Sequence, residues 1–385
     1  MNEPIPLARP ELGPREEELL LEVVRSGSLS LGPKLEQFEH DFSDWIGGEA
    51  YAVAVSSGTA ALHLGVRAKG WSQGDEVVTS PLSFIASSNC LLYEGAKPVF
   101  ADIDPVTLNL DPEKAAEAVG AKTAGLLPVH IFGYPADLPA FGALAKQHEL
   151  GILEDACQAL GATDSTGAKI GTDGNPATFA FYANKQMTTG EGGILVTPDK
   201  DVAEAMRSER NQGRAPDTEQ VEHDRLGFNY RLTDLHAAIG IAQLERLDEM
   251  LNARDNVAAL YRERLTQLGA EPCGEHDDED IVLPNENRGD ERRSWFVFCV
   301  QLPDGTDRDA VIKSLASNSI ASRAYLPCIH LLPPYRERFG FVGGEFPIAE
   351  RVAERSLALP FFTSMTESQV DRVCTALGEA LGKRP

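Results

Sequence analysis

Short runs of apolar, β-prone residues alternate with helical patterns through roughly the first two-thirds of the chain. Uninterrupted runs of this length are typical of strands buried in a largely parallel sheet. The predicted strands are Tyr51–Val55, Glu76–Thr79, Pro98–Ala101, Ala124–Val129, Gly151–Glu154, Thr178–Tyr182 and Gly193–Thr197. Strands that alternate with helices predict an α/β domain with a mostly parallel, seven-stranded sheet covered by helices.

Helical spacing of apolar residues predicts the elements around these strands. An amphipathic helix is expected first, from Pro14 to Arg25. The helices predicted between strands are Thr59–Ala68, Ser83–Tyr93, Pro112–Val119 and Leu138–His148. Across Thr233–Leu268 the apolar stripe is long enough to predict one long helix or a pair of helices.

The remainder of the chain has the pattern of a smaller α+β domain. The acidic stretch Pro272–Asp290 is expected to be a loop. A strand at Trp295–Leu302, a helix at Arg308–Asn318 and a final helix at Glu367–Leu381 are predicted after it. We therefore expect a large α/β domain over residues 1–245 and a small C-terminal α+β domain over residues 246–385.

Composition and charge narrow the classes of partner. The 385 residues are 42% hydrophobic and 24% charged, as in a globular protein, and the formal net charge is −24. A surface of this charge repels a phosphate backbone, so nucleic acid is not an expected partner. A phosphorylated small molecule remains possible, because a pocket can use backbone N–H groups and a few local cations.

The cysteines and the apolar segments indicate in which cellular compartment the protein is expected. Six cysteines are scattered without a C-x-x-C pair, so we expect neither a zinc site nor a disulfide framework. No metal site is expected elsewhere. The N-terminus lacks a charged segment followed by an apolar run, and no stretch reaches about 18 uninterrupted apolar residues. These features predict a cytoplasmic protein without a membrane span.

Ligands of parallel α/β sheets collect at the carboxyl ends of the strands, and unusual residues follow three of the predicted strands. The first set is Ser56–His63, where small residues and hydroxyls open a helix. The helix N-terminus, the permissive Gly58 and the hydroxyls of Ser57 and Thr59 could cradle a phosphate. Simple N-capping by Ser57 or Thr59 is the alternative.

The second set is Glu154-Asp155-Ala156-Cys157-Gln158-Ala159, in which Asp155 ends an otherwise apolar strand. A carboxylate in such a place requires a partner. A protonated ring nitrogen is one candidate, because a buried carboxylate raises the nitrogen's pKa and keeps it cationic. An N-cap or a salt bridge with a nearby arginine is the alternative.

The third set is Phe179–Gly193, where Lys185 follows an apolar run and precedes several small residues. A lysine that forms a Schiff base must be partly desolvated and must have room for a bulky carbonyl partner. An ordinary surface lysine at a strand end is the alternative. Together, a phosphate cradle, a carboxylate and an amine are the groups that pyridoxal phosphate requires.

These stretches resemble the DegT/DnrJ/EryC1/StrS family of pyridoxal-phosphate-dependent nucleotide-sugar aminotransferases, and the resemblance covers nearly the full length. It implies the fold-type I aminotransferase architecture. The motifs that carry it are Ser26–Pro33, Ser56–His63, Glu154–Ala159, Phe181–Gly193 and Gly227–Asp234.

The resemblance implies a role for each cofactor contact. Lys185 would form the internal aldimine with pyridoxal 5′-phosphate and shuttle the proton, with pyridoxamine phosphate as the intermediate. Asp155 would pair with the pyridine nitrogen. Gln158 would reach the phenolic oxygen, and Phe84 would stack on the ring, with core packing as its alternative. The residues that would hold the phosphate are Ser57, Gly58, Thr59 and, from the neighbouring subunit of a homodimer, Asn229.

Substrate contacts follow from the same resemblance. Arg231 would contact an anion at the subunit interface, with a structural salt bridge as its alternative. His330 lies where family members often place a histidine near the sugar, although a lone histidine is often structural. Tyr182 and Glu191 flank the lysine and could touch substrate. Many members have a serine where this chain has Ala180, so one phosphate hydroxyl is missing here.

The implied function is an aminotransferase that moves an amino group from an amino acid, expected to be L-glutamate, to a keto group of a nucleotide-linked sugar in amino-sugar biosynthesis. Residues 188–191 favour C4 amination of a 4-keto-6-deoxy sugar. A pyridoxamine-dependent sugar dehydratase would have histidine in place of Lys185. The remaining alternatives are other chemistry on an amino acid, and a non-enzymatic regulator that binds the cofactor or a nucleotide sugar.

Overall fold

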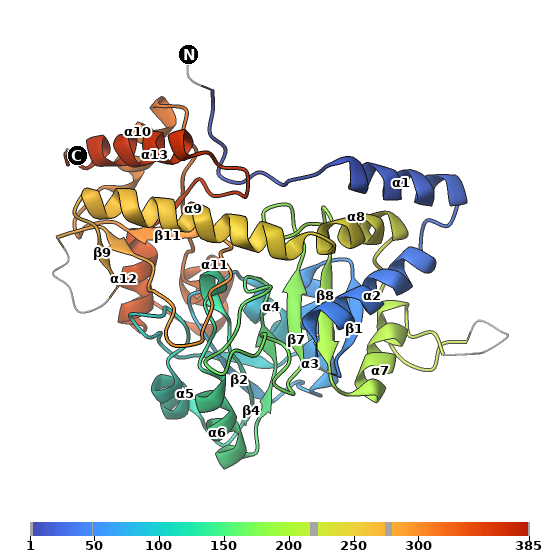
Figure 1. Ribbon diagram of the computed structural model, residues 1–385. Helices are drawn as coiled ribbons and strands as arrows, with labels where there is room; N and C mark the ends of the chain where they lie inside the picture. The colour runs from blue at the N-terminus through green and yellow to red at the C-terminus, as the bar shows by residue number, and fades with distance from the viewer. Residues whose placement is uncertain (1–2, 48, 216–221, 274–278, 384–385) are drawn as a thin grey trace.

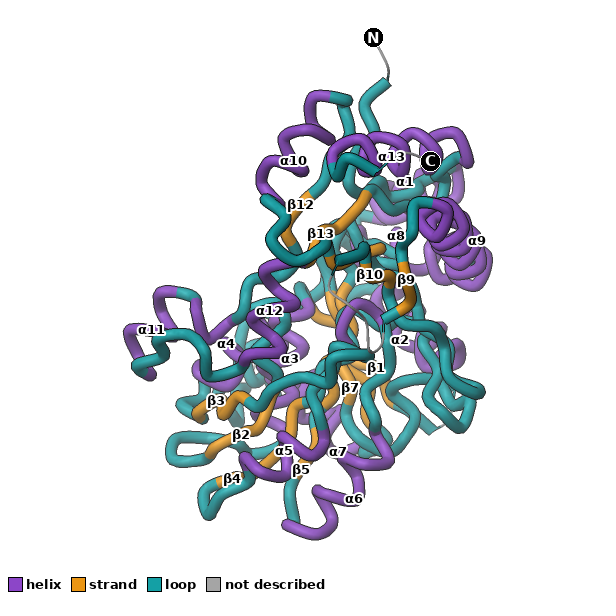
Figure 2. Tube along the Cα trace, turned by 90° about the vertical axis from the view of Figure 1, so that its left-hand side faces the viewer, coloured by secondary structure: helices purple, strands orange, loops and turns teal. Residues whose placement is uncertain are grey.

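Figure 1 shows a computed structural model of the chain, which describes residues 3–47, 49–215, 222–273 and 279–383. A large sheet lies in the lower part of the molecule with helices around it. A smaller sheet lies above it, near the C-terminus (Figure 2). Part of the acidic loop predicted over Pro272–Asp290 lies outside the described residues.

The large sheet consists of two four-stranded ladders, β3-β2-β4-β5 and β6-β7-β8-β1, that meet at residues 151–155. The N–H of Leu153 donates to Leu126 in the first ladder, and the next N–H, of Glu154, donates to Pro176 just before β7. The strands are β1 (Tyr51–Val55), β2 (Glu76–Thr79), β3 (Lys97–Phe100), β4 (Thr123–Leu127), β5 (Gly151–Ile152), β6 (Glu154–Asp155), β7 (Ala177–Ala180) and β8 (Gly193–Thr197).

Strand direction brings three carboxyl ends to the same edge of this sheet. The pairs β2–β3, β2–β4, β4–β5 and β6–β7 are parallel, whereas β8 runs antiparallel to both β1 and β7. β1 and β7 therefore point the same way, as does β6. The prediction of an α/β fold with a mostly parallel sheet is confirmed, and β8 is the strand that departs from it.

Helices pack against both faces of the large sheet. Ala52 and Ala54 of β1 face a cluster that includes residues of α1, α2 and α8, whereas Val53 and Val55 face residues of α3 and α7. This alternation is the period of a strand buried on both sides. The helices are α1 (Pro14–Ser26), α2 (Pro33–Ile46), α3 (Gly58–Ala68), α4 (Ala86–Tyr93), α5 (Pro112–Ala118), α6 (Leu138–His148), α7 (Lys200–Arg210) and α8 (Asp234–Leu244), with a short 3₁₀ turn at η1 (Ile131–Gly133).

Two of these helices, α2 and α7, were not predicted. In α2 the buried residues Leu35, Phe38, Phe42 and Ile46 recur at helical spacing, after a proline at the start of the helix. The Phe38 ring makes an edge contact with Phe181, just beyond β7. The pattern was present in the sequence, and α2 supports the strand that leads to Lys185.

The C-terminal part forms a five-stranded sheet of order β12-β13-β11-β10-β9, with helices around it. Its elements are α9 (Leu247–Gln267), β9 (Glu271–Pro272), β10 (Val282–Leu283), β11 (Phe298–Gln301), α10 (Arg308–Ser317), β12 (Arg323–Ala324), η2 (Ile329–Leu331), α11 (Pro333–Phe339), α12 (Pro347–Arg355), β13 (Ser356–Leu359) and α13 (Glu367–Ala380). The long apolar stripe is a helix pair, because α8 and α9 are separate.

Helix α9 runs across the top of the large sheet toward the C-terminal part (Figure 1). Its first turns, with Leu247 and Leu251, belong to the hydrophobic cluster of α1, α2 and α8. Its later turns, with Tyr261 and Leu265, belong to the cluster of the C-terminal sheet, which also includes Ile5 from the N-terminal segment. The division of the chain at 245/246 stays a prediction.

Within the described residues, no helix combines the length and hydropathy needed to cross a membrane. Among the described residues, no two cysteines form a disulfide.

Candidate active site

The three sequence stretches that follow β1, β6 and β7 meet in space. A Cβ atom placed on Gly58 would lie 2.6 Å from Cβ of Ala180 and 3.1 Å from Sγ of Cys157. The first contact is closer than real Cβ atoms approach and the second is tight, so a larger residue than glycine could begin α3 against β6 and β7 only if something shifted. The turn after β1, the end of β6 and the end of β7 thus form one site, as their strand directions predict.

The turn Ser57-Gly58-Thr59 leads into α3, and two of its backbone N–H groups are available to a ligand. Oγ of Ser57 accepts the N–H of Ala60 at 3.1 Å, so Ser57 is the N-cap of the helix. Among the described residues, the N–H groups of Gly58 and Thr59 have no acceptor. Capping and phosphate binding are therefore compatible here, because the cap uses one donor and leaves two at the positive end of the helix dipole.

Asp155 is buried at the end of β6 and is held by two donors. Oγ of Ser87 donates to Oδ2 at 2.6 Å, and the N–H of Cys157 donates to Oδ1 at 3.1 Å. Ser87 in turn lies 2.7 Å from Oγ of Ser83. Among the described residues no arginine pairs with Asp155, so the salt-bridge alternative does not apply. The two donors fix the carboxylate and leave lone pairs for a cationic ligand.

The ε-amino group of Lys185 has an aromatic ring for a neighbour. Nζ lies 3.9 Å from the centroid of the Phe296 ring. Among the described residues, no hydrogen-bond acceptor or carboxylate pairs with it. The residue is partly exposed, and burial of its amine lowers the pKa below the ordinary lysine value, although Cys157 and Asp155 act to raise it. An amine with a lowered pKa and no anionic partner is suited to Schiff-base chemistry.

Gln158 and Phe84 present groups that their own surroundings do not use. Oε1 of Gln158 accepts the N–H of Phe132 at 3.0 Å, which leaves the side-chain NH₂ as the end that can donate to a ligand. Phe84 precedes α4 and is 59% exposed, so core packing does not explain this ring. An aromatic ring left open in this way is available to stack on a flat ligand.

A buried pair of side chains lies on the other face of β6. Nδ1 of His130 accepts the N–H of Ala136, so Nε2 carries the hydrogen and donates to Oε2 of Glu154 at 3.1 Å. Burial lowers the pKa of His130 to about 4 and raises the pKa of Glu154 well above its usual value. Burial thus favours the uncharged form of both side chains.

Comparison with known proteins identifies this arrangement. The model of the DegT/DnrJ/EryC1/StrS aminotransferase family matches residues 10–378. The chain belongs to this family. The chain is 39% identical to GDP-perosamine synthase of Caulobacter vibrioides over 98% of both chains. It is 36% identical to the spore coat polysaccharide biosynthesis protein SpsC of Bacillus subtilis, over 98% of this chain and 97% of SpsC.

A solved structure shows the same fold. DesV of S. venezuelae, in complex with a ketimine intermediate, superposes with a TM-score of 0.90 and 32% identity over the whole of both chains. The predicted fold type I and the predicted enzyme class, a pyridoxal-phosphate-dependent aminotransferase, are confirmed. The donors of Ser57–Thr59, the carboxylate of Asp155, the amine of Lys185 and the open ring of Phe84 fit this cofactor.

Several residues that were predicted for this aminotransferase lie at the surface around the site. Asn229 is exposed, and its backbone pairs with that of Asn211. Arg231 donates to Oδ1 of Asn211 at 3.1 Å, so the structural salt bridge that was its alternative is not what the structure shows. Tyr182 is 51% exposed and Glu191 is also exposed, so both are accessible to a substrate.

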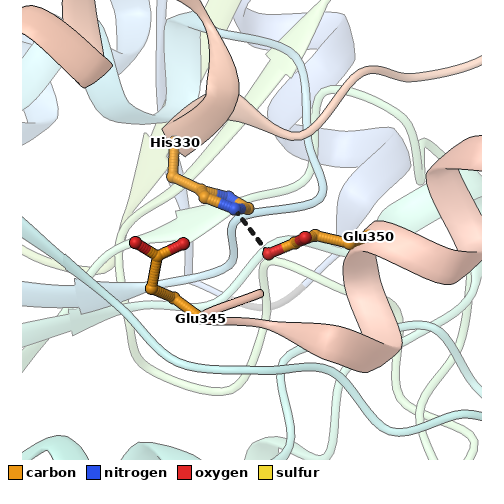
Figure 3. Close-up of side chains that lie close together, drawn as sticks. All are labelled: His330, Glu345 and Glu350. Atoms are coloured by element: carbon orange, nitrogen blue, oxygen red, sulfur yellow. Dashed lines mark hydrogen bonds and ion pairs between the residues drawn. The ribbon is translucent and has the colours of Figure 1, made fainter. Parts of the chain in front are cut away.

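His330 lies in the interior of the protein, close to two glutamates (Figure 3). Its ring is fully buried, and Nε2 donates to Oε1 of Glu350 at 3.0 Å. The rings of Phe341 and Phe346 pack against it, 5.6 and 4.7 Å away between centroids. In this arrangement a sugar could not reach the imidazole, so the geometry favours the structural alternative over substrate contact.

The carboxylates of this cluster are occupied by the backbone. Glu345 accepts the N–H groups of Val342 and Gly343, and Glu350 accepts those of Gly344 and Phe346. His330, Glu345 and Glu350 could surround a metal ion by distance. Because the glutamate oxygens already serve as acceptors of this turn, we assign no metal to the cluster and name it the histidine cluster.

Three residues beside the cofactor groups were missed in the sequence. Ser87, Phe296 and Arg254 contact Asp155, Nζ of Lys185 and the Lys185 carbonyl, respectively. Ser87 lies in the helix predicted over Ser83–Tyr93, but its contact with Asp155 joins residues 68 positions apart. Neither Phe296 nor Arg254 carries a local signal, because one sits in an apolar run and the other on a helix.

Proposed function

We propose that this enzyme transfers an amino group from L-glutamate to a keto group of a nucleotide-linked sugar. The observation that carries the proposal is the pairing, in one site, of an amine without an anionic partner, Lys185, with the fixed carboxylate of Asp155. The relatives GDP-perosamine synthase and SpsC, which cover almost the whole chain, support a sugar as the acceptor.

The residues would hold pyridoxal phosphate as follows. Lys185 would bind its aldehyde carbon covalently through Nζ, and the N–H groups at the start of α3 would bind its phosphate. Asp155 would keep the ring nitrogen protonated, and Phe84 and Gln158 would bind the ring face and the phenolic oxygen. When bound, the cofactor supplies an electron sink for the negative charge that develops at the carbon losing a proton.

The chain itself contributes proton transfer and orientation. Once an amino donor has displaced Lys185, the free Nζ removes the proton at the donor's Cα and returns a proton to the neighbouring carbon. The reverse transfer at the sugar carbon uses the same amine. Asp155 keeps its orientation throughout, because Ser87 and the N–H of Cys157 donate to its oxygens.

The acceptor that we propose to test first is a guanosine-diphosphate-linked 4-keto-6-deoxy sugar, aminated at C4. GDP-perosamine synthase, 39% identical, supports it. The segment 188–191 gives less support than its sequence suggested, because Oγ1 of both Thr188 and Thr189 donates to backbone carbonyls in the interior. Of the side chains in that segment, Glu191 is exposed and available to the sugar.

A homodimer would complete the site. Asn229, exposed and proposed to serve the neighbouring subunit's phosphate, lies beside an aromatic surface. There the Phe228 and Tyr230 rings stack 5.0 Å apart, next to the exposed Tyr93 and Leu226. Exposed apolar groups around a predicted shared residue are what a second copy would cover. We place the reaction in the cytoplasm.

The experiment is a panel of nucleotide-linked 3-keto and 4-keto sugars incubated with the purified holoenzyme and L-glutamate. Products are resolved by mass and by NMR at C3 and C4. The proposal expects an amino sugar together with 2-oxoglutarate in equal amounts, with the amino group at C4. If none of the keto sugars in the panel supports the formation of 2-oxoglutarate together with an amino sugar, the acceptor assignment is wrong.

The remaining alternatives are separated by a spectrum. An aminotransferase loses the visible absorption band of its cofactor when glutamate is added, and it regains the band with a keto acceptor. A regulator that only binds the cofactor keeps the band unchanged. An enzyme that does other chemistry on an amino acid changes the band without forming 2-oxoglutarate.

A further inference from the structure

The contact between Lys185 and Phe296 brings together two parts of the chain. Lys185 follows β7 of the large sheet, and Phe296 precedes β11 of the C-terminal sheet. Phe296 is 4% exposed, and Nζ of Lys185, the amine of the proposed reaction, lies 3.9 Å from the centroid of its ring. An aromatic face attracts a cation at this distance through the ring quadrupole.

A buried arginine fastens the two partners to each other. Nη2 of Arg254, on α9, donates to the carbonyl of Lys185 at 3.0 Å. Nη1 lies 3.4 and 3.5 Å from the carbonyls of Trp295 and Phe296. Arg254 is 4% exposed, and in the described residues its hydrogen bonds go to carbonyl groups and none goes to a carboxylate. Burying a charge without an anion costs free energy. The hydrogen bonds from Arg254 to the three carbonyl groups therefore have to offset this cost.

We propose that Phe296 is the site that holds the free ammonium form of Lys185, and that Arg254 is the positioning residue that keeps the ring and the amine in register. The inference rests on the proposed role of Lys185 as the amine of the reaction. Each time a donor displaces Lys185, Nζ is released as a free amine, and it becomes an ammonium when it takes up the proton that it removes from the donor's Cα. The ring then stabilises that proton on Nζ without offering an acceptor to which the proton could be lost.

The groups that face the amine define what the ring must do. Burial favours the neutral amine, whereas the Asp155 carboxylate and the Cys157 thiol favour the ammonium. Arg254 adds a positive charge on the backbone side of Lys185. The face of the Phe296 ring also stabilises the ammonium form of Lys185. Removing the ring's quadrupole while keeping its volume should therefore make Lys185 lose its proton at a lower pH.

The test measures the protonation of Lys185 in the cofactor-free protein. The protein is labelled briefly with acetic anhydride across a pH series, and the labelled fraction of the Lys185 peptide is quantified by mass spectrometry. Phe296→Leu is expected to lower the pKa of Lys185 by about one unit, which raises its labelling about tenfold at a fixed pH below that pKa. Phe296→Tyr, which keeps an aromatic face, is expected to leave the pKa near the wild-type value.

Lys169 is the matched control within the same samples. Its Nζ lies 4.1 Å from the Trp45 ring centroid, outside the site, so its labelling profile should not change in either variant. Arg254→Lys is the second arm: it keeps the charge but cannot hold three carbonyls, so the pKa of Lys185 is expected to move the same way as in Phe296→Leu. An unchanged or raised pKa of Lys185 in Phe296→Leu would overturn the inference.

A further measurement covers the case in which Phe296→Leu does not fold. Fluorinated phenylalanine at position 296 keeps the shape of the ring while weakening its negative face, and the pKa of Lys185 should fall with each added fluorine. No fall along that series would also overturn the inference. The proposed function is tested separately, since Lys185 can bind the cofactor covalently whether or not Phe296 sets its pKa.

Discussion

The site around Lys185 and the histidine cluster each bring a basic side chain close to carboxylates, but they differ in how their polar atoms are used. In the first, Nζ of Lys185 and the N–H groups of Gly58 and Thr59 lack acceptors among the described residues. In the second, Glu345 and Glu350 accept backbone N–H groups on both of their oxygens.

The difference separates a ligand site from a structural one. Buried or half-buried polar groups are normally paired, so a set of unpaired donors beside an exposed aromatic ring indicates a place that a ligand completes. Carboxylates that already hold a turn have fewer lone pairs to offer. The histidine cluster thus uses its histidine and glutamates to fix residues 342–346 against α12, and ligand chemistry is expected at the Lys185 site.

The largest effect is expected for Lys185→Ala. Loss of the amine removes both the covalent hold on the cofactor and the proton transfer, so transamination should fall by about 10⁴-fold. Stopped assays of 2-oxoglutarate formation measure it. Lys169→Ala, which removes a lysine that also lies over an aromatic ring, should keep activity. If Lys185→Ala turned over at the wild-type rate, the region around Lys185 would not be the catalytic site, and its contrast with the structural histidine cluster would fail.

Gly58→Ala is expected to weaken the cofactor site next. The added Cβ would meet Ala180 and Cys157 at 2.6 and 3.1 Å, so α3 must shift away from β6 and β7. Overpacking of this kind costs about 1–3 kcal/mol, and we expect at least a roughly tenfold loss of cofactor affinity in a fluorescence titration.

The matched substitution is Gly142→Ala in α6. A Cβ there meets nothing within 4 Å, so the free energy of unfolding should rise by up to about 1 kcal/mol with cofactor affinity unchanged. Wild-type affinity in Gly58→Ala would show that the start of α3 does not form the phosphate cradle.

Glu350→Gln should act on stability and spare the chemistry. Burial raises the pKa of Glu350, but the N–H groups of Gly344 and Phe346 and the His330 ring outweigh this and lower it overall. A carboxyl with a lowered folded pKa stabilises the protein above its unfolded pKa of about 4.3, and this contribution is lost as the pH falls through the folded pKa.

Urea unfolding across a pH series measures this. The wild type should lose stability on acidification, and Glu350→Gln should be less stable at neutral pH by about 1.5–3 kcal/mol but less sensitive to acid. The rate with glutamate should stay within about threefold of wild type. A large loss of turnover without loss of stability would instead bring the histidine cluster into the active site.

The smallest effect is expected for Ala180→Ser. Ala180 packs against Gly58, where many family members have a serine, so the new hydroxyl would lie beside the proposed phosphate cradle. One added hydrogen bond of about 0.5–1.5 kcal/mol should tighten pyridoxal phosphate by roughly 2- to 10-fold. Pyridoxal, which lacks the phosphate, serves as the control ligand. Equal tightening of both ligands would place Ala180 away from the phosphate.

Much of the fold and the centre of the site could be predicted because their signals are local. β1, β2 and β8 have the predicted bounds, since each is a short apolar run between turns. Lys185, Asp155 and the Ser57–Thr59 turn follow strands, and parallel strands bring such positions to one edge.

Long-range packing explains what the sequence could not show. The burial of His330 depends on Phe341 and Phe346, and the contact of Phe296 with Lys185 depends on how the C-terminal sheet lies on the large one. The antiparallel direction of β8 also has no local signal, because a buried strand looks the same in either orientation.

The most direct measurement traps the cofactor on the chain. The holoenzyme is reduced with borohydride, digested, and searched by mass spectrometry for peptides that carry the reduced cofactor. The account predicts the modification on Lys185 and none on Lys169 or the other lysines, with the label lost when glutamate is added before the reduction. A cofactor trapped on another lysine, or label on Lys185 that glutamate does not release, would contradict it.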